Sequence, residues 1–556
     1  MTTADVAPPA LCGLSHSWVA NREMEGRAGR RPVVSPATGE PFAEVSLLDA
    51  EQAGQGLEAA RAAFPAWSRL PFRDRARVLL KVREGLLAQS EDIAALIARE
   101  QGKPAVEAHV VEVFPALDAI KHLADHAEEL LREDVVEGHT VLLAHKDARL
   151  LYAPLGVVLA ITPWNYPFSI SLSAVTTALI AGNTVVLKPA PATTLVALRI
   201  GLLFRQAGVP EGVVNVLATD DAVASLLVED PRVSKIVFTG SVATGRKVMA
   251  AAARNLTPVV LELGGKDAAV VCRDADLDRT AKGVVWGAFV NAGQTCASVE
   301  RVYVEQPVAS ALIEKVVEET RRLRLGDPST AEVDVGPMTL ERQRRIVEEH
   351  VADAVARGAR VLTGGRRPEG PGYFYPPTVL VDVDHTMRIM REETFGPVLP
   401  IMAVPDLEEA VRLANDSEYG LTASAWTRDP ETARRLQHAL HAGVVTVNDC
   451  VYSYGEPTAP WGGVKHSGIG RTHGLQGLRE MVQVKYVTSE FGGGADLWWY
   501  PYGEEFHRFM STANRALHSR SRWTRLRANL QLLRSSRFRQ RARLSALLKN
   551  ADKLFS

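Results

Sequence analysis

The 556-residue sequence has little of what secreted, metal-binding or membrane-spanning proteins require. Its four cysteines, at positions 12, 272, 296 and 450, are too few and too scattered for a disulfide framework. They form no Cys-x-x-Cys pair and have no histidine cluster nearby, so no metal site is expected. The first thirty residues lack the apolar core of a signal peptide.

Long hydrophobic runs are also missing. The longest apolar stretch, Ala174–Leu187, is interrupted by Gly182 and Asn183 and is shorter than the roughly 18 residues that a membrane span requires. It predicts a buried helix followed by a strand. With 46% apolar and 23% charged residues, the chain has the composition of a globular, cytoplasmic protein with two or three structural units.

Charge is distributed unevenly along the chain. The net charge is −1, yet residues 501–556 contain thirteen Arg or Lys and only three Asp or Glu. The C-terminal segment therefore carries +10 and the first 500 residues −11. Opposite signs in the body and the tail indicate two different roles.

Between residues 156 and 263, short β-branched runs alternate with segments rich in Ala, Leu and Arg. The expected strands are Val157–Ile161, Thr184–Lys188, Val213–Leu217, Lys235–Thr239 and Pro258–Leu263, and the expected helices include Thr193–Ala207 and Val242–Arg254. This rhythm predicts an α/β fold with a parallel sheet covered on both faces. Such sheets bind ligands at the carboxyl ends of their strands.

Other segments complete the outline. Residues 51–135 look mainly helical, and a second alternating stretch runs from about residue 266 to 448, ending in the strand candidate Gly443–Val447. Two short strand candidates, Thr140–Val158 and Met481–Val487, lie outside both blocks.

Cys296 ends the sequence Asn-Ala-Gly-Gln-Thr-Cys, residues 291–296. A lone cysteine is usually a small buried apolar residue. Here Gly293 permits a tight backbone, and the polar Gln294 and Thr295 precede the sulfur. Backbone N–H groups could then point at an oxyanion beside it, which suggests a nucleophile.

A carboxylate interrupts an apolar run at Glu262, within Val-Val-Leu-Glu-Leu-Gly-Gly-Lys, residues 259–266. Burying this group costs free energy unless it is paired or functional. One interpretation is a buried ion pair, for example with Lys266. The other is a general base whose pKa is raised by apolar surroundings. The two glycines favour the base, because they let the chain turn and leave the site open.

Two loops that follow strands carry further candidates. Asn165 lies between two prolines in Thr-Pro-Trp-Asn-Tyr-Pro, residues 162–167. It is either a turn-forming residue bonded to its own backbone or an oxyanion donor. Gly240 and Ser241 open a helix whose N-terminus could bind a pyrophosphate, although this spacing occurs in many α/β loops.

Taken together, these segments resemble the aldehyde dehydrogenase superfamily over residues ~20–490. The matching blocks are Pro163–Asn165, Lys188–Pro189, Phe238–Ser241, Glu262–Lys266, Gly293–Cys296, Glu392–Pro397, Gly420–Ala423, and Gly462–Lys465 followed by Ser467–Gly468. Eight blocks in the right order make the resemblance specific.

The resemblance implies an NAD(P)-dependent oxidation of an aldehyde to a carboxylic acid. Cys296 would attack the aldehyde to form a thiohemiacetal, Asn165 and the Cys296 N–H would hold the oxyanion, and Glu262 would activate the water that hydrolyses the thioester. The residues implied to contact the cofactor are Trp164, Lys188 (adenosine ribose), Gly240, Ser241 (pyrophosphate), Gly245, Glu393 (nicotinamide ribose) and Phe395 (nicotinamide ring).

The implied fold is aldehyde dehydrogenase-like. A Rossmann-type cofactor domain of the five-stranded kind would comprise residues 1–135 and 156–263, and an α/β catalytic domain residues 264–464. Strands within 136–155 and 480–495 would form a small β oligomerisation element, giving a homodimer or homotetramer. Residues 496–556 would be a basic helical extension.

One departure from the family concerns the cofactor. Many NAD-preferring relatives place a glutamate three residues after the lysine, where it binds the ribose 2′-hydroxyl, but this sequence has Pro191 there. Without that carboxylate, a 2′-phosphate meets no repulsion. NADP is therefore compatible with the site, and the preference between NAD and NADP stays open.

Two other functions compete with this interpretation. A coenzyme-A-acylating semialdehyde dehydrogenase would typically lack the hydrolytic glutamate, which is present here as Glu262. A catalytically silent scaffold acting through its basic tail would have no reason to keep a carboxylate in an apolar run. The segment 448–461 at the family's substrate entrance offers Tyr452, Tyr454 and Trp461 but no Arg or Lys, which favours an apolar or aromatic aldehyde.

The tail lies beyond the resemblance. After a glycine-rich break at residues 492–494, the aromatic segment 497–502 is expected to dock on the body because it is costly to leave in water. Trp523, Leu526, Leu530 and Leu533 then recur at helical spacing among arginines, and Leu544, Leu547 and Leu548 begin a second such stretch. The tail is either a helical arm packed on protein or a basic amphipathic helix on an anionic membrane. Nucleic-acid binding is not expected, since the acidic body opposes it.

Overall fold

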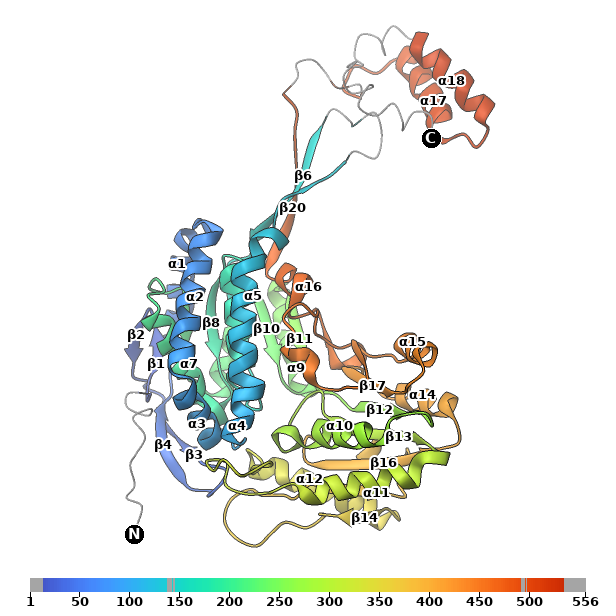
Figure 1. The fold of residues 1–556 in the computed structure, drawn as a ribbon. Helices are drawn as coiled ribbons and strands as arrows, with labels where there is room; N and C mark the ends of the chain where they lie inside the picture. Colours follow the sequence, from blue (N-terminus) through green and yellow to red (C-terminus); the bar gives the residue numbers. More distant parts are fainter. Residues whose placement is uncertain (1–13, 138–142, 144–145, 492–495, 497, 535–556) are drawn as a thin grey trace. The chain divides into compact units, whose positions relative to one another are not determined.

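The computed structural model describes residues 14–137, 143, 146–491, 496 and 498–534 (Figure 1). Its contacts divide the chain into two compact units. The larger unit comprises residues 1–131 and 154–483, and the smaller comprises residues 132–153 and 484–556. The larger unit contains every residue to which the sequence assigns chemistry.

The first sheet of the larger unit has eight strands. In spatial order they are β19 (Gly468–Ile469), β11 (Val259–Glu262), β10 (Val233–Thr239), β7 (Val157–Ile161), β8 (Thr184–Lys188), β9 (Val214–Val216), β1 (Ser17–Val19) and β2 (Arg22–Met24). The five strands from β11 to β9 are parallel, which confirms the predicted sheet. The chain proceeds from β7 outward to β9 and then crosses to β10, so the topological switch point lies between β7 and β10. Ligands bind at such points in open α/β sheets.

Helices cover both faces of this sheet (Figure 1). One face carries α1 (Ala50–Ser68), α8 (Asp221–Val228) and α9 (Val242–Ala252). The other carries α6 (Ser169–Ile180) and α7 (Thr194–Gln206), with α2 (Phe72–Ala88), α3 (Ser90–Glu100) and α5 (Phe114–Leu130) packed outside them. Because α6 lies between the sheet and these outer helices, it is buried nearly all round, and the apolar stretch 174–187 is a buried helix followed by β8, as predicted.

A second sheet of seven strands forms the other half of the larger unit. Its order is β14 (Arg360–Thr363), β15 (Thr378–Val381), β16 (Val398–Val404), β13 (Val299–Glu305), β12 (Asp267–Val271), β17 (Thr422–Trp426) and β18 (Val444–Val447). Alternate residues of β12 face opposite cores. One core is built with α10 (Leu277–Phe289) and α11 (Gln306–Arg322), and the other with α12 (Glu341–Ala356), α14 (Leu407–Asn415) and α15 (Pro430–Ala439).

The smaller unit contains a three-stranded sheet in the order β20 (Val482–Ser489), β6 (Asp147–Pro154) and β5 (Asp134–Val135). The two strand candidates outside the alternating blocks therefore belong to one sheet. Part of the candidate Thr140–Val158 lies outside the described residues, and the rest is divided between β6 and β7 at Gly156, whose φ of 138° ends the strand.

Two helices complete the smaller unit, α17 (Glu504–His518) and α18 (Arg522–Arg534). The helix predicted from Trp523 to Leu533 is confirmed as α18, whereas the sequence analysis did not identify α17. The expected docking of the aromatic segment on the body stays a prediction. Within the smaller unit, Tyr502 stacks on Phe506 at the start of α17, with ring centroids 5.4 Å apart. The second leucine stretch, at 544–548, lies outside the described residues.

Within the described part of the chain, the helices are too short or too polar to cross a lipid bilayer.

Candidate active site

The residues predicted to carry chemistry lie at the facing edges of the two sheets. Asn165 follows β7, Ser241 follows β10, and Glu262 ends β11, so all three lie at the carboxyl edge of the first sheet. Cys296 precedes β13 and Phe395 precedes β16, so these two lie at the amino edge of the second sheet. The site thus lies between the carboxyl edge of the first sheet, where the switch point is, and the amino edge of the second sheet.

Cys296 follows a short 3-10 turn, η6 (Val290–Gly293), with unusual backbone geometry. Asn291, Ala292 and Gly293 all have positive φ angles, of 56°, 53° and 72°. A Cβ atom at Gly293 would lie 2.3 Å from the Gly396 carbonyl oxygen, so only glycine fits this close approach. Burial, reinforced by the carboxylates of Asp267, Glu262 and Glu393, raises the pKa of the Cys296 thiol above its usual value.

Asn165 lies against the cysteine loop rather than against its own backbone. Its side-chain Nδ2 donates a hydrogen bond to the Gln294 carbonyl oxygen at 2.9 Å, and Asn291 Nδ2 donates to the Asn165 carbonyl oxygen at 2.8 Å. In the next position, the Tyr166 hydroxyl and Thr295 Oγ1 are 2.7 Å apart. The predicted oxyanion donor therefore contacts Gln294, two positions before the predicted nucleophile. The alternative, a turn residue whose side chain is bonded to its own backbone, is wrong.

Glu262 is buried, with 6% of its surface exposed, and faces a cavity that Cys296 also lines. Neither of its carboxylate oxygens has a hydrogen-bond partner among the described residues. Burial raises its pKa well above the usual range, and the nearby Arg471 only partly opposes this effect. The interpretation of an ion pair with Lys266 is wrong, because Lys266 Nζ binds Glu300 at 2.6 Å and Thr394 Oγ1 at 3.1 Å.

The loop between β10 and α9 has the features of a pyrophosphate site. Ser241 is the N-cap of α9, and its hydroxyl accepts a hydrogen bond from the Thr244 N–H at 3.3 Å. Gly240 N–H donates to the Glu262 carbonyl at 3.0 Å, and a Cβ at Gly245 would lie 2.6 Å from Leu263, so α9 packs closely on the sheet. The positive end of this helix fits a dinucleotide phosphate.

Lys188 ends β8 and is buried, and its Nζ lies 3.4 Å from the exposed Asp221 carboxylate. Burial lowers the pKa of Lys188. The half-buried Arg31, on β3 (Arg30–Val34), is a second cation near this lysine and was not predicted. Pro191 begins the 3-10 turn η4 (Pro191–Thr193) that leads into α7.

Glu393 and Phe395 lie on the segment that precedes β16. Glu393 Oε1 accepts a hydrogen bond from the Gly265 N–H at 3.0 Å, and burial raises the pKa of Glu393 to about 8. The Phe395 ring meets Trp164 edge to face, with centroids 5.4 Å apart. The structure thus brings together, near Cys296 and Glu262, the residues that the resemblance assigned to the nicotinamide end of the cofactor.

Comparison with known proteins agrees with this arrangement. The model of the aldehyde dehydrogenase family matches residues 23–487. The chain belongs to the aldehyde dehydrogenase family. It is an NAD(P)-dependent enzyme that oxidises an aldehyde to a carboxylic acid.

Three relatives illustrate the similarity. A probable NADP-dependent succinate-semialdehyde dehydrogenase of Sinorhizobium fredii is 40% identical, covering 84% of this chain and 95% of that protein. A 4,4'-diapolycopene aldehyde oxidase of Methylomonas is 38% identical, covering 86% and 90%. The NAD+ complex of the Bacillus cereus aldehyde dehydrogenase superimposes with a TM-score of 0.83 at 31% identity, covering 86% and 97%.

Buried charged residues that were not predicted from the sequence support the site of the dehydrogenase. Glu300, at the start of β13, accepts the Lys266 ammonium and also the Thr394 and Phe395 N–H groups, both at 2.8 Å. This carboxylate therefore fixes the segment that carries Glu393 and Phe395. Two adjacent charged residues in the sequence Ser-Val-Glu-Arg-Val, 298–302, were the available signal.

A second buried pair supports the Asn165 loop. Lys103 Nζ binds Glu112 at 2.7 Å, and Glu112 also accepts the N–H groups of Phe168 and Ser169 at the start of α6. The Lys103 ammonium lies 3.9 Å from the Tyr166 ring centroid. Glu112 belongs to η2 (His109–Val113), a π-helical turn of the kind often found at functional sites.

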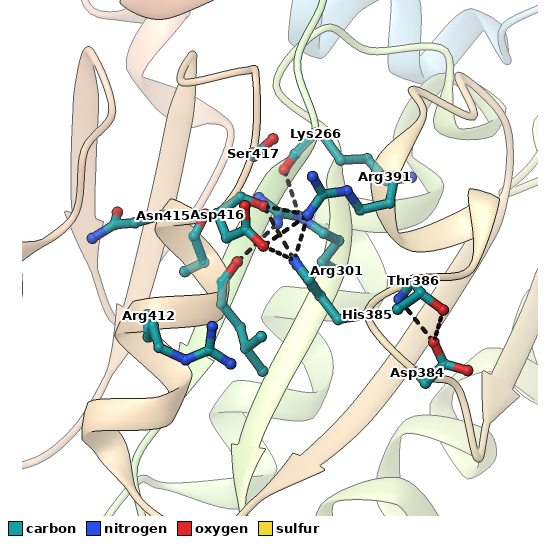
Figure 2. Close-up of polar contacts among 12 residues, drawn as sticks. Lys266, Arg301, Asp384, His385, Thr386, Arg391, Arg412, Asn415, Asp416 and Ser417 are labelled. Carbon is teal, nitrogen blue, oxygen red and sulfur yellow. Dashed lines mark hydrogen bonds and ion pairs between the residues drawn. The ribbon is translucent and has the colours of Figure 1, made fainter.

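Arg301 links Lys266 to the end of α14 (Figure 2). Its buried guanidinium donates to the Lys266 carbonyl at 2.8 Å and to the carbonyls of Leu413 and Ala414. Beyond it, His385 and Arg391 both bind the Asp416 carboxylate, at 3.1 and 2.9 Å (Figure 2). The turn between Glu262 and β12 is thereby tied to the core of the second sheet.

Proposed function

We propose that this dehydrogenase oxidises aldehydes with an apolar or aromatic tail. The observation that carries the proposal is a cavity of about 330 Å³ that reaches Cys296. Its lining is mainly aliphatic and aromatic and includes Val110, Val111, Phe114, Trp286, Val451 and Tyr452. Among the described residues that line it, Glu456 is charged and none is Lys or Arg. A semialdehyde carboxylate would have to lose water there without gaining a cation.

The entrance of this cavity is apolar as well. Phe114, Tyr452 and Trp286 line it and are 68%, 53% and 41% exposed, so large apolar side chains reach the surface at the opening. Contiguous exposed apolar surface typically marks a binding site. The names of the relatives do not indicate the class of aldehyde, since one is named for succinate semialdehyde and another for 4,4'-diapolycopene aldehyde.

The proposed catalytic residues are Cys296, Glu262 and Asn165. Cys296 attacks the carbonyl carbon of the aldehyde, and the oxyanion is held by the Cys296 N–H and by the Asn165 amide, which has a second N–H besides the one given to Gln294. The bound dinucleotide supplies hydride acceptance, after which the substrate is a thioester on Cys296. Glu262 then takes a proton from the water that hydrolyses this thioester, a role that fits its raised pKa.

The residues proposed to hold the cofactor are Trp164, Lys188, Gly240, Ser241, Gly245, Glu393 and Phe395. We propose that NADP is accepted, because Pro191 offers no carboxylate to repel a 2′-phosphate. Arg31 and Lys188 supply positive charge at this end of the site, which supports the proposal. Asp221 is exposed there and can turn toward solvent.

A charge-insertion experiment tests the substrate class. Phe114→Arg places a cation at the entrance, where the parent side chain is mostly exposed, so folding should be preserved. We expect kcat/KM to fall at least tenfold for octanal and to rise for succinate semialdehyde. Leu226→Arg, on α8 at a similarly exposed position outside the cavity, is the matched control. A wild-type enzyme that prefers succinate semialdehyde over octanal would refute the proposal.

We further propose the domain division and assembly that the resemblance implies. Residues 1–135 and 156–263 bind the cofactor, residues 264–464 carry the nucleophile, and strands within 136–155 and 480–495 join subunits into a homodimer or homotetramer. The sheet formed by β20, β6 and β5 supports this assignment, because it contains strands from both segments and β20 lies at its edge among the described strands.

For residues 496–556 we propose peripheral contact between a cytoplasmic enzyme and an anionic membrane surface. Trp523, Leu526 and Leu530 on α18 are 74%, 47% and 49% exposed, next to Arg522, Arg525 and Arg527. Exposed aromatic and aliphatic groups beside arginines suit a headgroup region. An apolar aldehyde would be found at such a surface.

A further inference from the structure

A second, smaller cavity reaches both Cys296 and Glu262. We call it the inner chamber; its polar lining is formed by Ser173, Thr177, Thr239, Glu262, Thr472 and His473. Its volume is about 30 Å³. A water molecule needs roughly 10–15 Å³ of such space and two to four polar partners. The inner chamber therefore has room for one or two water molecules beside the predicted base.

The polar atoms around the inner chamber need such water. Both oxygens of Glu262, Thr472 Oγ1 and His473 Nδ1 are buried and have no hydrogen-bond partner among the described residues. Buried polar atoms in native proteins are nearly always hydrogen-bonded. All four atoms belong to residues that line the inner chamber, and ordered water there would satisfy them.

The His473 ring is held in a defined orientation. Its Nε2 lies 3.0 Å from Ser173 Oγ, and its ring packs on Tyr454 with centroids 4.5 Å apart. We assign the ring proton to Nε2, which then donates to Ser173 Oγ and leaves Nδ1 as a hydrogen-bond acceptor. Burial, with a smaller contribution from His122 on α5, lowers the pKa of His473 to about 4, so the ring stays neutral at physiological pH.

The backbone at His473 is strained. This residue, just before α16 (Gly474–Arg479), has φ 61° and ψ 166°, a region that only glycine adopts freely. A histidine there costs roughly 1–3 kcal/mol of backbone strain. The preceding residue, Thr472, pairs with Trp461 through two backbone hydrogen bonds of 2.7 and 2.8 Å, which fixes the strained turn. A residue needed only for the turn would be glycine, so the side chain at 473 serves another purpose.

We propose that His473 is a positioning residue for deacylation, orienting the hydrolytic water between its Nδ1 and the Glu262 carboxylate. The water donates one hydrogen bond to Nδ1 and the other to Glu262. Its oxygen bonds to the acyl carbon, its proton passes to Glu262, and the carbon–sulfur bond breaks with the electron pair returning to Cys296 as thiolate. The second proton stays on the product acid, which ionises in solvent. This inference rests on the role proposed above for Glu262.

The test separates acylation from deacylation without a cofactor. With p-nitrophenyl acetate, acylation of Cys296 releases a burst of p-nitrophenolate, and the following steady rate reports deacylation. We expect His473→Ala and His473→Gly to keep the burst amplitude and to lower the steady rate about tenfold. His473→Asn, which offers an amide oxygen near the position of Nδ1, should recover most of that loss. His438→Ala, an exposed histidine on α15, is the control.

Thermal unfolding distinguishes a positioning role of His473 from a purely structural one. His473→Gly should unfold at a higher temperature than His473→Ala because it relieves the strain, yet deacylate equally slowly. A structural residue would instead show a deacylation rate that follows stability, and that result would overturn the proposal. So would an unchanged steady rate in His473→Ala.

Failure of the proposed function can be distinguished from failure of the proposed role of His473. If Cys296→Ala keeps the burst, or Glu262→Gln deacylates at the wild-type rate, the assignment of the catalytic residues is wrong. If both behave as expected while the His473 variants match wild type, only the positioning role is refuted.

Discussion

Glu300 offers the sharpest test of how the site is held together. The carboxylate is 2% exposed and accepts three hydrogen bonds, from the Lys266 ammonium at 2.6 Å and from the Thr394 and Phe395 N–H groups at 2.8 Å. Glu300→Gln keeps the size of the side chain but removes its charge. Lys266, itself 1% exposed, is then left with Thr394 Oγ1 as its remaining partner among the described side chains.

The expected loss follows from leaving a buried ammonium without its counter-ion. Breaking one partner of a buried ion pair costs about 3–5 kcal/mol. For cooperative units of 150–250 residues, each kcal/mol lowers the midpoint of unfolding by roughly 2–4 °C, so a decrease of about 6–20 °C is expected. Because Glu300 also fixes the segment that carries Glu393 and Phe395, the KM for the cofactor should rise in parallel.

The measurement is thermal unfolding of Glu300→Gln beside Glu318→Gln. Glu318 pairs with Arg322 on α11, but both side chains are more than 60% exposed, so this control should lose at most about 1 kcal/mol. A double variant with Lys266→Met should recover part of the loss, since it removes the unpaired charge. Equal stability of the two single variants would refute the account of Glu300 as the support of the cofactor segment.

Four further results are expected. Cys296→Ala should lose more than nine-tenths of the dehydrogenase activity while keeping the wild-type unfolding temperature. Glu262→Gln should show a burst of NAD(P)H before a slow steady state; because burial raises the pKa of Glu262, the carboxylate fraction and the wild-type deacylation rate should increase with pH, and the variant should lose this dependence. Pro191→Glu should shift the kcat/KM ratio toward NAD at least tenfold, whereas a wild-type preference for NAD beyond ~10³-fold would contradict our interpretation of Pro191. Removing residues 495–556 should leave activity intact but change sedimentation or salt-dependent liposome flotation, and identical behaviour of both forms would show the tail to be passive.

The sequence predicted the parts of the fold that depend on local pattern. Strands with β-branched residues ended within one residue of the predicted position, and this placed Asn165, Ser241 and Glu262 at the carboxyl edge of one sheet. The family resemblance then selected Glu393 and Phe395, which precede a strand of the second sheet, as proposed cofactor residues. The resemblance placed segment 448–461, which contains no Arg or Lys, at a substrate entrance, and its residues Tyr452, Tyr454 and Trp461 all line the large cavity.

The features that could not be predicted depend on contacts between residues that are far apart in the sequence. The partner of Lys266 is Glu300, which lies 34 positions away and is brought close by the pairing of β12 with β13. Carboxylates in apolar runs, such as those of Glu262 and Glu300, look alike until this register is known. The sequence alone therefore could not decide whether Glu262 is a general base or a member of an ion pair. His473 was missed for another reason, since nothing in the residues around it indicates that its backbone adopts a glycine-like conformation.

The large cavity has a consequence for the direction of turnover. The proposed substrate enters as a neutral aldehyde, whereas the product acid is an anion once it has ionised in solvent, and the lining includes Glu456 and, among its described residues, no cation that could bind it. Holding a carboxylate in such surroundings is costly, and Glu456 adds repulsion of like charge. The lining that we propose to select the substrate would therefore also disfavour rebinding of the acid made from it, and we expect the fatty or aromatic carboxylate to inhibit the enzyme far more weakly than its aldehyde binds.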